Sequence, residues 1–180
     1  MSGVRVNFTE FSARVADVAL QMPGVASALA KRATVLLAHE IVQGAYYGPG
    51  TPVDTGAARN SWTAFPSDEG STAKPFTPRR SPDQTGAAAM ALIIQAVEMS
   101  APDVVRFTLA TACPYMNVLE YGNHSRQAPD GMIRVALAAW QRIVDMAARD
   151  VRRRVIREIN FDTGLSLDDG APGGGDDAGG

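Results

Sequence analysis

The chain has 180 residues, of which 46% are hydrophobic and 20% charged, and a formal net charge of −2. This length and composition predict one domain with a buried core, and they exclude a mostly disordered or collagen-like chain. The near-neutral charge excludes a global attraction to nucleic acid, and the single cysteine, Cys113, excludes an intrachain disulfide. No apolar run reaches the roughly 18 residues that a membrane-spanning helix needs, so we expect no membrane partner.

The first fifty residues have the periodicity of two helices. Large apolar residues recur at helical spacing at Phe8, Phe11, Val15 and Val18. They predict a short amphipathic helix over residues 9–21. The Pro23–Gly24 pair interrupts this helix, and because proline is tolerated in a first helical turn, a second helix is expected to start there. Glycines and a proline predict its end at residues 46–50.

The middle of the chain alternates strands, loops and helices. Residues 58–65 are expected to form a strand after a turn, and residues 66–85 a long proline-rich loop. We interpret this loop, with its Arg79–Arg80 pair, as an interface loop that contacts a neighbouring subunit. An alanine-rich helix is predicted over residues 86–98, a strand with period-two alternation over 105–109, and one or two helical turns over 115–121.

The C-terminal part has the clearest periodicity. Apolar residues step by three and four through Ile133, Leu137, Trp140, Val144, Ala147, Val151 and Val155. They predict one helix of about 25 residues, capped by Asp130 or by the preceding turn. Four arginines share one helical stripe, which we expect to meet an acidic partner: Arg149, Arg152, Arg153 and Arg157. Residues 161–180 form a glycine-rich acidic tail that we expect to be flexible.

These elements predict an α+β fold. Two N-terminal helices precede a small antiparallel or mixed sheet with a long loop, and a long C-terminal helix packs across it. Residues 1–160 would form a single domain, followed by the tail. Because a sheet of two or three strands is marginal by itself, its edges are expected to pair with another subunit.

The sharpest local motif is Pro52-Val53-Asp54-Thr55-Gly56, followed by Arg59, Asn60 and Trp62. Its Asp-Thr-Gly core resembles the active-site triplet of retroviral-type aspartic proteases, in which two aspartates share a proton across a dimer axis. That family has a compact all-β fold, whereas this triplet follows a long helical segment. The structural alternative is a turn, in which the Asp54 and Thr55 side chains bond downstream amides and Gly56 takes a positive φ.

A second pair of motifs follows the predicted second strand. Tyr115 begins a segment that ends in Leu-Glu120-Tyr121-Gly122, and Ala-Pro129-Asp-Gly131-Met comes shortly after. Taken in order with the first helices and the Asp-Thr-Gly segment, these motifs resemble the tail-completion or neck proteins of long-tailed bacteriophages, also described as minor tail components or head–tail joining proteins. The resemblance covers residues 29–151.

The resemblance implies a structural virion protein, made in the host bacterial cytoplasm and built into the tail and neck. It implies a homo-oligomeric ring, expected as a hexamer with a dodecamer as the alternative, between a portal-side adaptor or head-closure protein and a tail terminator or tail-tube protein. DNA would pass through the ring without sequence-specific binding. The expected motif and interface residues are Asp54, Thr55, Gly56, Arg59, Asn60, Trp62, Arg79, Arg80, Tyr115, Glu120, Tyr121, Gly122, Pro129, Gly131, Arg152 and Arg153.

Catalytic chemistry has little other support in the sequence. The conceivable metal ligands are His39, Glu40 and His124, and they lack the spacing of a zinc site. No glycine-rich phosphate loop is present. We therefore expect no enzyme activity, cofactor or metal. The alternatives left open are the dimeric aspartic protease and a small DNA-binding protein that uses the Arg149–Arg157 cluster.

Overall fold

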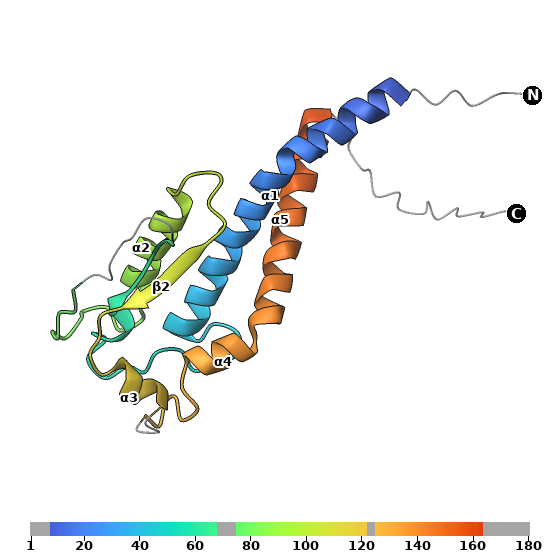
Figure 1. Cartoon of the computed structure of the whole chain (residues 1–180). Helices are drawn as coiled ribbons and strands as arrows, with labels where there is room; N and C mark the ends of the chain where they lie inside the picture. Colours follow the sequence, from blue (N-terminus) through green and yellow to red (C-terminus); the bar gives the residue numbers. More distant parts are fainter. Residues whose placement is uncertain (1–7, 68–74, 122–124, 164–180) are drawn as a thin grey trace, which may run out of the picture.

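The computed structural model describes residues 8–67, 75–121 and 125–163, with side chains described in residues 24–67, 75–121 and 125–157. Within these ranges the chain has the expected α+β fold, with a two-stranded antiparallel sheet set among helices. Figure 1 shows α1 at the centre, with α2 and the sheet on one side of it and α5 on the other. Gly122 and the acidic tail from residue 164 lie outside the described residues.

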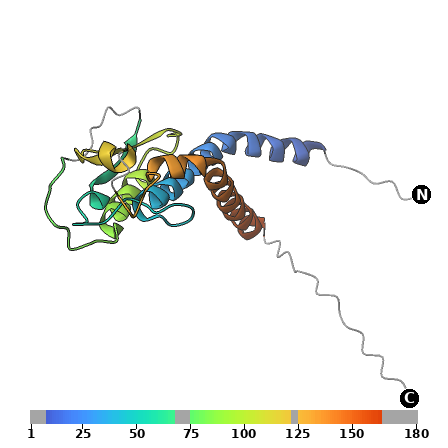
Figure 2. The same cartoon turned by 90° about the horizontal axis from the view of Figure 1, so that it is seen from below.

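The two expected N-terminal helices are a single helix, α1, which spans Phe8–Gln43. The predicted break at Pro23–Gly24 is therefore wrong. A proline inside a helix removes one hydrogen bond and crowds the carbonyl four residues before it, which bends a helix without necessarily ending it. Figures 1 and 2 show α1 continuing as one helix that changes direction along its length. At about 1.5 Å per residue, α1 is about 54 Å long. Figures 1 and 2 show its N-terminal part extending beyond the rest of the fold.

The sheet consists of β1 (Trp62–Pro66) and β2 (Phe107–Thr111), paired antiparallel with Ala64 opposite Leu109. The expected strand at residues 58–65 begins later, because residues 59–61 form a 3₁₀ turn, η1. The helix α2 (Ala87–Glu98) confirms the prediction over residues 86–98 and packs against β1 and α1.

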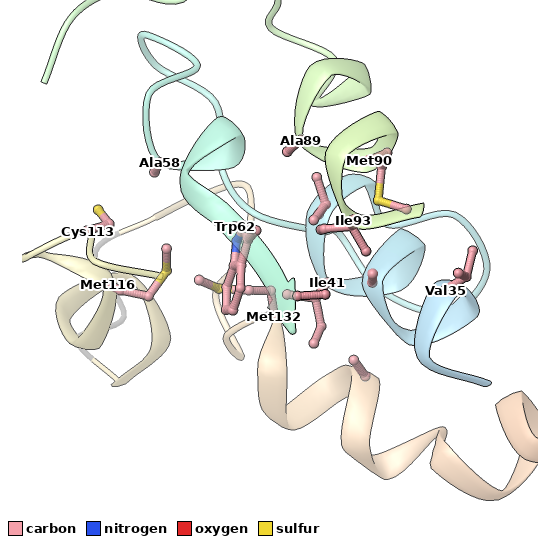
Figure 3. Packing of buried hydrophobic residues seen from close by; sticks show 14 of the residues in the cluster. Val35, Ile41, Ala58, Trp62, Ala89, Met90, Ile93, Cys113, Met116 and Met132 are labelled. Carbon is pink, nitrogen blue, oxygen red and sulfur yellow. The ribbon is translucent and has the colours of Figure 1, made fainter. Parts of the chain in front are cut away.

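The main core lies where α1, α2 and the sheet meet. Its largest buried side chains include Trp62, Ile93 and Met132. Figure 3 shows Trp62 between Met116 on one side and Ile41 on the other. A second cluster joins α1 to α5 through small residues and Ile143, which is fully buried. Together the two clusters use both sides of α1, so this helix holds the domain together.

The short helix α3 spans Met116–Tyr121, as expected. The long C-terminal helix is divided at Ala139 into α4 (Ile133–Ala138) and α5 (Trp140–Thr163). The buried residues described in these two helices and at their junction are Ala136, Ala139, Ile143, Ala147 and Val151. Leu137 and Trp140, which were expected on the packed face of an unbroken helix, are 54% and 41% exposed.

Candidate functional site

The Asp54–Gly56 segment forms a turn, as its structural interpretation predicted, with one difference: among the described residues Thr55 bonds a downstream amide, whereas the exposed Asp54 side chain does not. Gly56 has a φ of +76°, and a Cβ at this position would lie 2.8 Å from the carbonyl oxygen of Asp83. The Thr55 side chain accepts a hydrogen bond from the amide of Ala57 at 3.4 Å, and the Thr55 carbonyl accepts one from the amide of Ser81 at 2.8 Å. The turn therefore closes against residues 81–83, at the end of the long loop.

Arg59 and Asn60 serve as internal braces of this turn. The Asn60 Nδ2 donates to the carbonyl oxygens of Gly56 at 3.1 Å and of Asp83 at 2.6 Å. The Arg59 Nε donates to the Thr51 carbonyl at 2.8 Å. Burial is the main cause that lowers the pKa of Arg59 from its ordinary value, and the nearby Asp83 opposes it. Both side chains are committed to backbone carbonyls within the fold.

Trp62 is only 4% exposed, which places it in the core. Its indole Nε1 donates to the Thr51 hydroxyl at 2.9 Å, and that hydroxyl donates to the Ile41 carbonyl at 2.8 Å. This chain of hydrogen bonds ties β1 to the last turn of α1. It satisfies the buried polar atom that a tryptophan carries into a core.

The long loop is anchored in its described C-terminal part. Phe76 packs edge-on against Tyr115, with ring centroids 5.6 Å apart. Burial, a hydrogen bond with Cys113 and the charge of Asp54 together raise the pKa of Tyr115 to about 12. Arg79 and Arg80 are exposed. Residues 68–74 of the expected interface loop lie outside the described residues.

Glu120 explains the second pair of motifs. Its side chain is 2% exposed, yet its carboxylate accepts hydrogen bonds at 2.9 Å from each of the backbone amides of Met132, Ile133 and Arg134. Glu120 therefore caps the N-terminus of α4 from a distant part of the sequence, and Asp130 does not provide the cap that was expected of it. Burial acts to raise the pKa of Glu120, but the three amides and Arg134 outweigh it, so the pKa lies below its ordinary value.

Gly131 makes room for this carboxylate. It has a φ of +80°, and a Cβ there would lie 2.7 Å from both the carbonyl oxygen and the Oε1 of Glu120. Arg134 covers the outside of the arrangement, with its guanidinium 5.2 Å from the centre of the Tyr121 ring. Pro129 lies exposed in the same loop. The Leu-Glu-Tyr and Ala-Pro-x-Gly-Met segments thus form one capping unit.

Glu40 is a second buried carboxylate that binds backbone amides, and the sequence analysis missed this role. Its side chain is buried, and its two oxygens accept hydrogen bonds from the amides of Tyr46 and Tyr47, both at 2.8 Å. The sequence did contain a signal for this role, because Glu40 falls on the apolar face of its helix, just before the glycine-rich segment that ends the helix. The neighbouring His39 pairs instead with Gln43 at 2.9 Å. In the part of the chain that the structure describes, no group of three His, Cys, Asp or Glu side chains is placed to hold a metal ion.

A basic cleft of about 530 Å³ lies along one side of α1, between α2 and α5. Five cationic side chains line it: Lys31, Arg32, Arg153, Arg154 and Arg157. Two acids, Glu98 and Asp150, also line it, and Asp150 bridges Arg32 and Arg153. The hydrogen bond from Arg32 is the leading cause that lowers the pKa of Asp150. Among the arginines of the expected stripe, only Arg153 and Arg157 line this cleft.

An apolar groove of about 680 Å³ lies on another side of α1, between β2 and the α4–α5 junction. Its walls include Leu29 and Leu37 of α1, Phe107 and Leu109 of β2, and Leu137 and Trp140 at the junction. Val105, which also lines it, is 51% exposed. Leu137 and Trp140, on either side of the break at Ala139, are part of the wall of this groove.

Comparison with protein-family models, with curated proteins and with solved structures finds no match to this chain. Among the described helices, none is long and apolar enough to cross a bilayer. The assignment of function therefore depends on the surfaces above and on the order of the sequence motifs.

Proposed function

We propose that this protein is a structural subunit of a bacteriophage neck, one copy in a ring that completes the tail and joins it to the head-side connector. The proposal takes its family from the order of motifs in the sequence. It takes its physical support from what those motifs do in the fold, and from the surfaces that the fold leaves open.

The motif residues support a structural role rather than a catalytic one. Asn60 and Glu120 are each committed to several backbone groups, and Trp62 is buried. Side chains that a reaction uses need access to a substrate. Residues that shape two turns and cap a helix instead keep the same subunit surface in every copy.

The observation that carries the proposal is the open apolar groove beside a sheet with unpaired edges. In the described chain, β1 and β2 pair only with each other, so each strand has an outer edge without a partner strand. Leu137 and Trp140 leave a large apolar area facing solvent. Both features are typical of a protein that is completed by association with other subunits.

The channel of such a ring has to let DNA pass. Arginine and lysine contacts with phosphates create salt-dependent adhesion. The basic cleft holds Glu98 and Asp150 among its cations, and Asp150 already pairs with two of the arginines. We therefore place this cleft outside the channel, in contact with an acidic protein surface, because a cleft of mixed charge is poorly suited to binding DNA.

Reconstitution tests the proposal. The purified full-length chain is mixed with candidate portal-side and tail-tube proteins from the same phage and measured by mass photometry and electron cryomicroscopy. We expect a closed ring seated between the two partners. A chain that binds neither partner and forms no ring, alone or in the mixture, would overturn the proposal.

The Asp54→Asn variant separates this function from the aspartic protease alternative. Loss of the carboxylate abolishes a catalytic aspartate but leaves the Thr55 and Gly56 contacts of the turn in place. We expect the variant to join rings as the unchanged chain does. If the unchanged chain cleaves peptides and Asp54→Asn does not, the protease alternative holds.

A further inference from the structure

The apolar groove has the character of a binding site for a helix. Its walls come from α1, β2 and the α4–α5 junction, and its lining is mostly aliphatic and aromatic. Leu137 and Trp140 remain 54% and 41% exposed within it. An amphipathic helix that binds in such a groove presents anchors at i, i+3, i+4 and i+7.

The chain carries a helix of this kind at its own N-terminus. Residues 8–23 of α1, here called the arm, continue beyond the fold by about 24 Å at 1.5 Å per residue. Figures 1 and 2 show this part of α1 leaving the region where α2 and the sheet pack. The arm therefore lies away from the sheet and α2 of its own chain.

The sequence of the arm supplies the anchors. Its apolar residues step by three and four through Phe8, Phe11, Val15, Val18 and Met22. In a helix this spacing favours a single apolar stripe. The same steps continue in the sequence through Val25 to Leu29, which lines the groove and also packs against the cluster that joins α1 to α5. The sequence period of the arm therefore leads into the α1 wall of the groove.

The arm cannot fill the groove of its own chain. The groove is bounded by α1 itself, and α1 is an unbroken helix from Phe8 to Gln43. Folding the arm back would require breaking that helix and losing its hydrogen bonds. A second copy presents an identical arm without this cost.

We propose that the arm of one copy binds in the apolar groove of a neighbouring copy. This inference rests on the proposed self-assembly and names the two surfaces that carry it. The contact joins two different surfaces of the same chain, so repeating it head-to-tail generates a ring when the rotation between neighbours closes.

Photo-crosslinking in the full-length chain tests the contact. A benzophenone amino acid replaces Val15, and equal amounts of ¹⁵N-labelled and unlabelled chains are mixed so that only bonds between copies carry both labels. We expect mixed-label crosslinks to peptides that contain Leu137–Val144 or Phe107–Leu109. Self-association with no crosslink at either groove segment would overturn the inference.

Matched substitutions measure the contribution of each surface. Leu137→Gln removes an apolar side chain from the groove, and Leu92→Gln is its control, since Leu92 is 49% exposed on α2 and does not line the groove. Phe11→Gln alters the arm stripe, and Ala13→Gln is its control on the opposite side of the helical period. We expect roughly tenfold or greater loss of self-association for Leu137→Gln and Phe11→Gln, and less than threefold for the controls.

Circular dichroism and melting temperatures establish that all four variants remain folded. Equal losses in the variants and their controls would refute a specific arm–groove contact. Rings that form with partners but give no arm–groove crosslink would refute this inference and leave the proposed function standing. Crosslinks confined to a closed dimer that never forms rings would support the contact and count against the neck ring.

Discussion

The cap that Glu120 provides leads to a quantitative prediction for Glu120→Gln. The carboxylate accepts three backbone hydrogen bonds at 2.9 Å and one from the Arg134 Nε at 3.3 Å. Glutamine keeps one acceptor oxygen but turns an NH₂ group toward amides that also donate. At least one buried amide then loses its acceptor, and the negative charge at the N-terminus of α4 disappears.

The expected cost follows from these losses. A hydrogen bond to a charged group contributes about 1.5–3 kcal/mol, and an unsatisfied buried donor costs about 1–3 kcal/mol. Because these contributions are not additive, we expect Glu120→Gln to lower the free energy of unfolding by about 3 kcal/mol. For a domain of this size that is a fall of roughly 6–12 °C in melting temperature. The control is Asp130→Asn, which changes an exposed acid in the same loop, and we expect less than about 0.5 kcal/mol.

The pH dependence gives a second readout of the same prediction. The pKa of Glu120 is lower in the folded chain than in the unfolded chain. Its stabilisation is therefore present above the unfolded pKa of about 4.3 and is lost as the pH falls through the folded pKa. Thermal melts should show the gap between the unchanged chain and Glu120→Gln narrowing below about pH 4. A constant gap from pH 7 to pH 3, or equal losses in Glu120→Gln and Asp130→Asn, would refute the capping argument.

Three further predictions concern other parts of the molecule. Gly131→Ala places a Cβ 2.7 Å from Glu120 at a strained φ, so chemical denaturation should show a free energy of unfolding lower by about 2–4 kcal/mol. Its control is Gly24→Ala in helix α1, where a Cβ would meet nothing within 4 Å and the free energy of unfolding should rise by up to about 1 kcal/mol. Arg153→Glu should weaken ring assembly with partners at least severalfold more than Arg152→Glu, since Arg153 lines the basic cleft and Arg152 does not; equal effects of the two variants in an assembly titration would show that the cleft does not contribute to assembly. Deletion of residues 164–180 should leave the melting temperature within a few degrees and raise self-association at low salt; a large loss of stability would mean that the tail packs on the core.

Local patterns predicted most of the elements but not where helices are joined or divided. The period of apolar residues located α2 and α3, because each is short and bounded by glycine or proline. It placed the second strand at residues 105–109, two residues before its observed position at Phe107–Thr111. The Pro23–Gly24 pair was taken as a boundary, yet α1 continues through it. At Ala139 the error was the reverse, since the sequence has no proline or glycine where α4 gives way to α5. Whether a helix continues or ends at such a residue depends on its packing against distant elements, and the spacing of apolar residues carries no information about that packing.

The two buried carboxylates that bind backbone amides, Glu40 and Glu120, show a second limit of prediction from sequence. The motif around Glu120 was recognised, and Gly131 was expected to matter. The hydrogen bonds that Glu120 accepts come from the amides of residues 132–134, twelve or more residues along the chain. Glu40 was grouped with His39 as a conceivable metal ligand, whereas it binds two amides beyond the end of its own helix. An acidic residue within an apolar period is the signal in both cases, and only the fold identifies its partner.

The unbroken length of α1 has a mechanical consequence. One helix of 36 residues contributes a wall to the basic cleft, a wall to the apolar groove and the whole of the arm. Both walls belong to the segment after Gly24, so they tilt together, whereas the arm joins that segment at Pro23–Gly24, the kind of position at which helices bend. A rotation of about 5° at this position displaces the tip of the arm by about 2 Å over its length of about 24 Å. A small change of angle at Pro23–Gly24 therefore adjusts the reach of the arm without changing the shape of the cleft or the groove.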